Sequence, residues 1–318
     1  MGRLPRDSQN RAAVHRGSHA RVASSPQHSA SHAQKRKGSG PWTVVLVVAL
    51  LVLLVSAGCL AYLGLSYWQG QRVYDRLEDA VEVSESTQLA DFKVDWSALA
   101  EINPDVVGWI YVPGTIINYP IVHRAGDDSY YLTHNFNGET VGDFGAEYGA
   151  IMLSGANSGD FSDEANFIYG HHMSNGMMFA CLQDFAEADE FNAHREAYVL
   201  TPEGNYLLSS FAIIRAAGNE AELVSPNFAS AGEMEEYVQG KMDHSLVTPD
   251  PASSSAQEID KVFALITCDS SNNTYRYIPF FEVVDYYSFA DGSYLTGKSL
   301  VDHGDLVEIG DAVADRVS

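Results

Sequence analysis

Cys268 and Arg276 are the first residues whose types and spacing could do chemistry. An apolar run that starts at Lys261 ends at Thr267 and Cys268, a short polar loop follows, and a second β-like run carries Arg276. Two strands joined by such a loop would place a thiol beside a fixed cation. A thiolate that attacks a carbonyl needs stabilisation of the resulting oxyanion, and a guanidinium, which stays protonated, suits that task.

A proton carrier is the further requirement of a cysteine nucleophile. His171 is the candidate, because it follows the apolar run 166–169 and Gly170, which leaves room for close approach. A single histidine at a strand end is more often a packing or surface residue, and the pair His171-His172 could instead indicate a metal site. Adjacent residues on a strand point to opposite faces, however, and no further ligands stand at zinc-site spacing, so we expect no metal and no cofactor.

Short strands separated by turns are the elements that must position these groups. Residues 109–122 read as two strands around Pro113-Gly114, and residues 197–200 and 206–214 read as a hairpin around the turn at 202–205. Further short apolar runs lie at 130–132, 150–153 and 166–169. The pattern predicts a mainly β domain, either a barrel or a sandwich.

Two segments have helical spacing instead. Met178, Cys181, Leu182 and Phe185 would form one face of a short helix, with Cys181 as a buried free cysteine. A Cys181–Cys268 disulfide is the alternative for both cysteines, since an oxidising compartment would permit it. The second helix is expected near residues 233–242, inside a long interruption at 218–257 whose size suggests a functional insertion.

The charge of the chain is divided. Residues 1–67 carry eight Lys/Arg against one acidic residue, whereas residues 68–318 carry eleven against forty-one. Phosphate backbones are bound by Lys and Arg, so the charge of the acidic body argues against nucleic-acid partners. Residues 43–67 hold no charge over twenty-five residues, roughly 37 Å as a helix at about 1.5 Å per residue, which is enough to span a bilayer. A cleaved signal peptide is the competing interpretation, but its apolar core is shorter and begins nearer the start of the chain.

The orientation follows from the basic residues, which precede the apolar stretch. The positive-inside rule then places the N-terminus in the cytoplasm and the acidic body outside the cell. Trp42 at one end and Trp68 at the other fit the aromatic belts of a bilayer. Beyond the span, Val73, Leu77 and Ala80 share one face at helical spacing, which predicts a stalk or first helix packed on the domain.

The motifs together resemble those of sortases. Leu265-Ile266-Thr267-Cys268 followed by Arg276 resembles the family's cysteine and arginine signature, and residues 168–173 (IYGHHM) resemble its histidine motif. Residues 103–110 (NPDVVGWI), 113–115 (PGT), 118–122 (NYPIV) and 130–132 (YYL) resemble the opening of the catalytic domain of class B sortases. The resemblance covers roughly residues 70–285 in the same order.

The resemblance implies a fold and a division of the chain. The expected fold is a closed sortase-like β-barrel with N-terminal helix or helices and a helix-bearing insertion between late strands, preceded by one transmembrane helix. The expected parts are a disordered basic cytoplasmic tail at 1–41, the anchor at 42–68, a helical stalk or N-terminal helix at 69–95, the catalytic domain at 96–290 and an acidic tail at 291–318.

The resemblance also implies a function. The protein would be a membrane-anchored cysteine transpeptidase of a Gram-positive cell surface, acting on secreted proteins or pilins that carry a C-terminal sorting signal. Cys268 would form a thioacyl-enzyme, His171 would transfer protons and Arg276 would stabilise the oxyanion. Leu132 and Thr267 are the expected substrate-binding residues. The acceptor would be the amine of a peptidoglycan precursor or of a pilin lysine, in cell-wall anchoring or pilus assembly.

Two other functions use the same sequence features. A surface cysteine peptidase would give the acyl group to water, and an anchored binding module would leave Cys268 inert. A papain-like enzyme is disfavoured, because its cysteine precedes its histidine whereas His171 here comes first.

Overall fold

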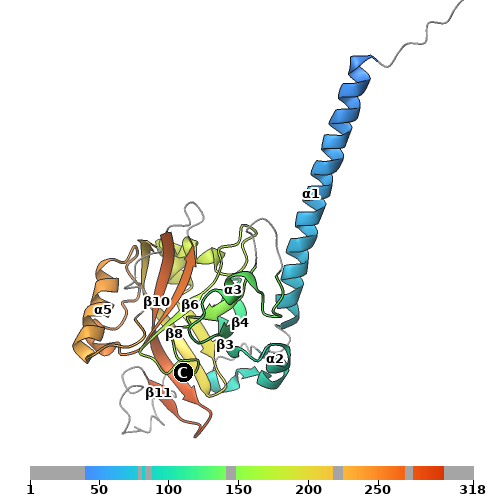
Figure 1. Ribbon diagram of the computed structural model, residues 1–318. Coiled ribbons are helices and arrows are strands. Elements are labelled where there is room, and N and C mark those ends of the chain that lie inside the picture. Colours follow the sequence, from blue (N-terminus) through green and yellow to red (C-terminus); the bar gives the residue numbers. More distant parts are fainter. Residues whose placement is uncertain are drawn as a thin grey trace, which may run out of the picture. The chain divides into compact units, whose positions relative to one another are not determined.

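The computed structural model describes residues 40–77, 81–82, 88–140, 148–217, 225–268 and 275–296. The chain divides into two units, residues 1–54 and 55–318. The second unit contains the strands (Figure 1) and also the candidate functional residues. The basic tail expected at 1–41, the loop 269–274 and most of the acidic tail expected at 291–318 lie outside the described residues.

Eight strands close into a barrel, as expected from the sequence. Around the ring the order is β10, β8, β7, β3, β4, β5, β6 and β9, and β9 pairs again with β10. Two neighbouring pairs, β4 with β5 and β6 with β9, are parallel and the others are antiparallel. The bounds are β3 (Val106–Tyr111), β4 (Asn118–His123), β5 (Ile151–Leu153), β6 (Ala165–Tyr169), β7 (Glu196–Leu200), β8 (Gly204–Ala217), β9 (Val262–Cys268) and β10 (Tyr275–Ser288).

Both hairpins expected from turn residues are present. β3 and β4 pair on either side of the turn that contains Gly114, whose φ of 76° is a conformation that glycine adopts at little cost. β7 pairs with β8 with Leu200 opposite Asn205. The prediction of a strand at residues 130–132 was wrong, because these residues belong to the helical turn α3 (Tyr130–Thr133).

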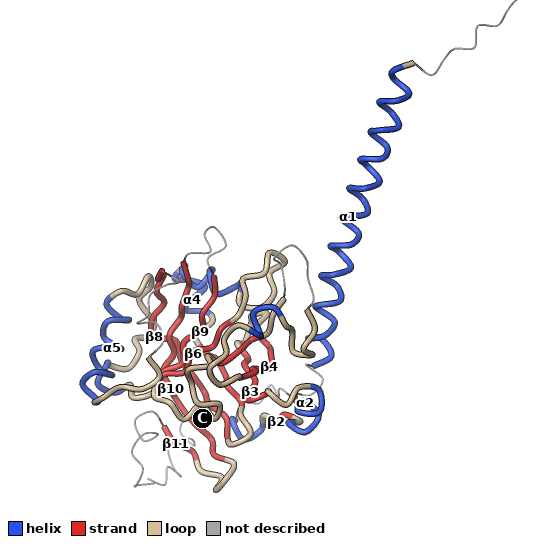
Figure 2. Tube along the Cα trace, in the orientation of Figure 1, coloured by secondary structure: helices blue, strands red, loops and turns tan. Residues whose placement is uncertain are grey.

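Helices surround the strands (Figure 2). The insertion carries α5 (Ala231–Asp243), which contains the expected helix at 233–242 and buries Met234 and Val238. The short helix expected around Cys181 is a 3-10 helix, Ala180–Ala186, and it buries Leu182 and Phe185. The remaining helices are α2 (Trp96–Ile102), α4 (Ala188–Ala193) and 3-10 turns at Leu89–Asp91 and Ala256–Glu258.

The first helix, α1 (Pro41–Leu77), continues well beyond its apolar portion. Its segment Pro41–Leu65 is long and apolar enough to cross a membrane, and none of that segment is buried in the protein. The last turns bury Val73 and Leu77 against the domain, as the helical spacing predicted, whereas Ala80 lies outside the described residues. The described part of the expected stalk after Leu77 is not helical throughout, since β1 (Val81–Glu82) pairs there with β2 (Lys93–Val94).

Two apolar clusters cover the two faces of β9. Phe263 and Leu265 belong to the larger cluster, together with residues of β3, β4, β7 and the end of α1. Val262, Ala264 and Ile266 belong to the second cluster, which includes Met234 and Val238 of α5. A strand buried on both faces reads as a continuous apolar run, which explains why residues 262–267 do not alternate with polar residues.

A buried lysine fixes the start of β9. The Nζ of Lys261 donates hydrogen bonds of 2.6 Å to the carbonyl oxygens of Phe161 and Asp163, on the segment that leads into β6. Burial lowers the pKa of Lys261 to about 8, and the charge of Asp163 opposes that shift. These bonds help to fix the register in which β6 and β9 lie side by side.

Replacing Leu265 by Ala tests the importance of the larger cluster. The side chain is fully buried in β9, so Leu265→Ala should lower the free energy of unfolding by about 2–5 kcal/mol. Leu246, which is 50% exposed, is the matched control, and Leu246→Ala should change stability by less than about 0.5 kcal/mol. Denaturant unfolding followed by tryptophan fluorescence measures both, and equal midpoints for the two variants would contradict the assignment.

Candidate active site

Three strands bring residues 171, 268 and 276 to one edge of the barrel. β6 runs parallel to β9, with Tyr169 opposite Ile266. The amide of Gly170 donates a 3.1 Å hydrogen bond to the carbonyl of Ile266. Continuing that register places position 171 at the level of position 268. On the other side of β9, Cys268 is paired directly with Arg276 in β10.

The spacing follows from sheet geometry. Neighbouring strands lie about 4.8 Å apart, so the backbones at 171, 268 and 276 span about 10 Å across three strands. Directly opposite residues of an antiparallel pair belong to the same face of the sheet. The structure therefore brings together the three residues that the sequence selected as nucleophile, proton carrier and cation.

The imidazole of His171 is held by a backbone carbonyl. Its Nε2 lies 2.6 Å from the oxygen of Leu132, in α3. A carbonyl oxygen can only accept a hydrogen bond, so Nε2 carries the hydrogen and Nδ1 is the nitrogen that gains or loses a proton. The backbone of His171 is fixed as well, because its carbonyl accepts a 2.9 Å hydrogen bond from the amide of Phe179.

Arg276 lies near the same group of residues. Its Nη1 donates a 3.1 Å hydrogen bond to the carbonyl of Tyr275. Burial and, to a lesser extent, the charge of Asp128 raise the pKa of the Tyr169 hydroxyl to about 12, and the charge of Arg276 opposes this shift. The guanidinium is thus close enough to Tyr169, two residues before His171, for their charges to interact.

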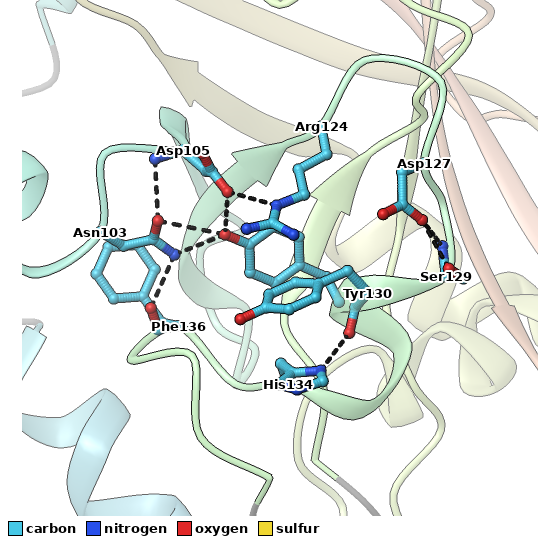
Figure 3. A network of polar contacts seen from close by, with 9 residues as sticks. Asn103, Asp105, Arg124, Asp127, Ser129, Tyr130, His134 and Phe136 are labelled. Atoms are coloured by element: carbon cyan, nitrogen blue, oxygen red, sulfur yellow. Dashed lines mark hydrogen bonds and ion pairs between the residues drawn. The ribbon is translucent and has the colours of Figure 1, made fainter.

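A polar network around Asp105 and Arg124 fixes α3 (Figure 3). The carbonyl of Leu132, in α3, contacts His171. Asp105 accepts 2.7 Å hydrogen bonds from Nε of Arg124 and from the hydroxyl of Tyr131. The side-chain amide of Asn103 donates a 2.9 Å hydrogen bond to the hydroxyl of Tyr131 and a 2.8 Å hydrogen bond to the carbonyl of Phe136. The network joins the loop before β3, the end of β4 and the segment that contains α3.

Stacking adds to this network. The guanidinium of Arg124 lies 3.6 Å from the centre of the Tyr130 ring, and the Tyr130 ring stacks on His134 at 4.0 Å. Burial alone would raise the pKa of the Asp105 carboxyl, but hydrogen bonds from Arg124 and Tyr131 and the charge of Arg124 outweigh it and lower that pKa. Asp105 is therefore ionised at neutral pH and holds both partners.

The two expected substrate-binding residues have different surroundings. Leu132 has 45% of its surface exposed beside His171, so its side chain is available to a ligand. Thr267 is only 1% exposed, and its Oγ1 has no hydrogen-bond partner among the described residues. The side chain of Thr267 is therefore packed inside the barrel wall rather than displayed at its surface.

Cys181 lies apart from this chemistry. It forms no disulfide, which removes the Cys181–Cys268 alternative, and its side chain is partly buried against the larger cluster. Burial raises the pKa of the Cys181 thiol to about 11, so it stays protonated at neutral pH. Thiols in this state are poor nucleophiles.

A cavity of about 740 Å³ lies between α5 and β8. Its lining includes Ala216, which pairs with Arg276 across the sheet, together with Tyr237 and Lys241 of α5. The cavity therefore reaches the strand that neighbours the candidate cation. Within the part of the chain that the structure describes, no group of three His, Cys, Asp or Glu side chains is arranged to hold a metal ion.

The supporting residues were not found from the sequence. Asp105 and Tyr131 lie in segments that were singled out for their strand-like or family-like pattern, not for their polar contacts. Asp105 and Arg124 are nineteen residues apart, a spacing that matches no local motif. The one available signal was the presence of an arginine in an acidic domain that has few basic residues.

Comparisons with known proteins agree with this arrangement. The chain is 30% identical to Sortase B of Listeria monocytogenes over 175 residues, which are 55% of this chain and 67% of that protein. It is 20% identical to Sortase B of Staphylococcus aureus over 229 residues, covering 72% and 90% of the two chains. No family model matches the sequence.

Solved structures give the same result. The crystal structure of sortase B from Clostridium perfringens matches with a TM-score of 0.53 and 27% identity over 59% of this chain and 99% of that chain. Sortase B from Bacillus anthracis in complex with AAEK1 matches with a TM-score of 0.57 and 25% identity, over 69% of this chain and 98% of that chain.

The pH dependence of stability tests the Asp105 network. A carboxyl with a lowered pKa in the folded state contributes stability above its unfolded pKa of about 3.9, and loses it as pH falls through the folded pKa. Asp105→Asn keeps the shape but removes the charge. The melting temperature of the wild type should exceed that of the variant by a constant amount above about pH 5, and the difference should shrink below about pH 4. A difference that does not depend on pH would contradict the assignment.

Proposed function

Because this chain belongs to the class B sortases, which are cysteine transpeptidases, we propose that it cleaves a C-terminal sorting signal of secreted proteins and transfers the acyl group to an amine. The observation that carries the proposal is the strand register that aligns positions 171, 268 and 276. This register aligns the backbones of a histidine, a cysteine and an arginine from distant parts of the sequence, which supports the proposed roles.

The roles of the three residues follow from their chemistry. The thiolate of Cys268 attacks the scissile carbonyl, forming a C–S bond. Collapse of the tetrahedral intermediate breaks the C–N bond, and His171 gives its Nδ1 proton to the departing amine. His171 then accepts a proton from the incoming amine, which attacks the thioester and releases the thiolate. The guanidinium of Arg276 stabilises the oxyanion in both steps.

The surroundings of the site suggest where the peptide lies. Leu132 offers an exposed apolar side chain beside His171, and the cavity between α5 and β8 opens next to the strand that carries Arg276. We assign the insertion that carries α5 as one wall of the substrate groove. Thr267, which is buried, supports the barrel in this proposal rather than contacting the peptide.

The location follows from α1 and the charge distribution. Pro41–Leu65 would cross the membrane once, with the basic N-terminus in the cytoplasm and the acidic domain outside. There the domain would meet secreted proteins that carry sorting signals and an acceptor amine, of a peptidoglycan precursor or of a pilin lysine. The product would be a protein anchored to the cell wall or an assembled pilus.

Acyl-transfer assays on single-residue variants of the protein test the proposal. A panel of sorting-signal peptides is incubated with the protein and either oligoglycine or a lysine peptide as acceptor. Cys268→Ala should abolish transfer, since no other described thiol is available to replace it. His171→Ala should lower kcat/KM by about 10²–10⁴-fold and Arg276→Lys by about 10²-fold.

Matched controls separate chemistry from folding. Cys181→Ala should leave transfer and thiol labelling unchanged, because that thiol stays protonated. His194→Gln alters a histidine at the end of α4 that does not line the cavity between α5 and β8, and it should behave as the wild type. Product that is hydrolysed to the same extent with and without added amine would favour a peptidase. Full transfer by Cys268→Ala would overturn the assignment of Cys268 as the nucleophile.

A further inference from the structure

The end of α1 is built into the catalytic domain. Val73, Tyr74 and Leu77 are 6%, 2% and 4% exposed and belong to the larger apolar cluster. Tyr74 lies nine residues after Leu65, the last residue of the candidate membrane span. The last turns of the helix that carries the span are therefore packed among the residues that surround the barrel.

Tyr74 makes a specific polar contact there. Its hydroxyl donates a 2.8 Å hydrogen bond to the carbonyl oxygen of Gly149. Its ring packs edge to face on the ring of Tyr119, with the ring centres 5.3 Å apart. Burial raises the pKa of Tyr74 well above its ordinary value, so the hydroxyl remains a hydrogen-bond donor throughout the pH range of a living cell. The ring fills space in the core, and the hydroxyl fixes a backbone segment.

That segment lies directly against the candidate proton carrier. Gly149 has a φ of 57°, and a Cβ built on it would lie 2.6 Å from Cδ2 of His171 and 2.7 Å from the carbonyl oxygen of Tyr131. Both distances are far shorter than van der Waals contact. The amide of the next residue, Ala150, donates a 2.9 Å hydrogen bond to the same carbonyl of Tyr131.

The imidazole of His171 is thus confined on two sides. The backbone of Gly149 lies against one edge of the ring, and the carbonyl of Leu132 holds Nε2 at 2.6 Å. Tyr131 and Leu132 are successive residues of α3, so the Gly149 backbone and the Leu132 carbonyl belong to one connected unit. A displacement of Gly149 would move this unit and the ring together.

We propose that Tyr74 is a positioning residue for proton transfer: by holding Gly149, it keeps the imidazole of His171 against the Leu132 carbonyl. The end of the membrane helix is then part of the acid–base machinery as well as a tether. The inference rests on the proposed role of His171 as the group that protonates the departing amine. Tyr74 itself does not contact the reacting atoms.

Two substrates with different leaving groups, an amide and an ester, can show whether Tyr74 positions His171 or only stabilises the fold. An amide substrate needs a proton on its departing amine, whereas an ester of the same peptide with an acidic phenol releases a phenolate without one. Loss of a positioned acid therefore slows the amide and spares the ester. A general loss of folded enzyme lowers both rates equally, and titration of the reactive thiol corrects for it.

The experiment uses the full chain in detergent micelles, with kcat/KM measured for the amide and the ester. Tyr74→Phe keeps the ring and removes only the hydroxyl. We expect it to lower the amide value by about tenfold, a part of the 10²–10⁴ that a general acid contributes, and to leave the ester value within about twofold. Gly149→Ala, whose methyl group would press on the imidazole, should give the same selective loss.

Two further variants calibrate the measurement. His171→Ala sets the full selective loss, and Tyr206→Phe removes the hydroxyl of another buried tyrosine, packed against Phe263 and Tyr286. Tyr206→Phe should keep the wild-type ratio of amide to ester. If His171→Ala slows both substrates equally, its proposed acid role fails, and the inference fails with it.

If His171→Ala is selective but a folded Tyr74→Phe is not, only the inference is overturned, whatever Gly149→Ala shows. A Tyr74→Phe chain that fails to fold leaves the decision to Gly149→Ala, whose equal loss on both substrates would also overturn it.

Discussion

The two-sided pairing of β9 is the constraint on which the site depends. β9 runs parallel to β6, so the ends of both strands lie at one edge, and antiparallel to β10, so the start of β10 lies at that same edge. A histidine after one strand, a cysteine at the end of the next and an arginine at the start of the third must therefore meet. A slip of one residue would move a position to the opposite face of the sheet. Closure of the barrel between β9 and β10 prevents such a slip.

Burial on both faces of β9 makes this register stable. One face lies in the larger cluster and the other is covered by residues of α5, so moving the strand would expose apolar side chains on either side. At the start of the strand, Lys261 donates to two carbonyls of the segment before β6. The insertion that carries α5 therefore has a structural task as well as a place in the proposed groove, because Met234 and Val238 complete the cluster beneath it.

The sequence predicted a mainly β domain, a barrel or a sandwich, and the three candidate site residues from local patterns, and the resemblance to sortases then implied a closed barrel. Turn residues mark the hairpins, and a continuous apolar run marks a strand buried on two faces. It failed at residues 130–132, where two tyrosines and a leucine favour a strand locally. Contacts distant in the chain decide the conformation instead: the Tyr131 hydroxyl binds Asn103 and Asp105, and its carbonyl accepts from Ala150. Contacts of this kind follow no residue spacing.

The site therefore has two supports of different origin. Strand pairing sets the backbone at positions 171, 268 and 276, but it ends where β6 ends, so it cannot orient a side chain at 171. The imidazole is oriented instead by Leu132, whose turn is held by the Asp105 network, and by the backbone of Gly149. The carboxylate of Asp105 acts on His171 through hydrogen bonds and a rigid turn rather than by direct contact. The backbone positions of Cys268 and Arg276 thus depend on the register of the barrel, whereas the orientation of the His171 imidazole depends on a separate set of contacts that can vary while the barrel stays intact.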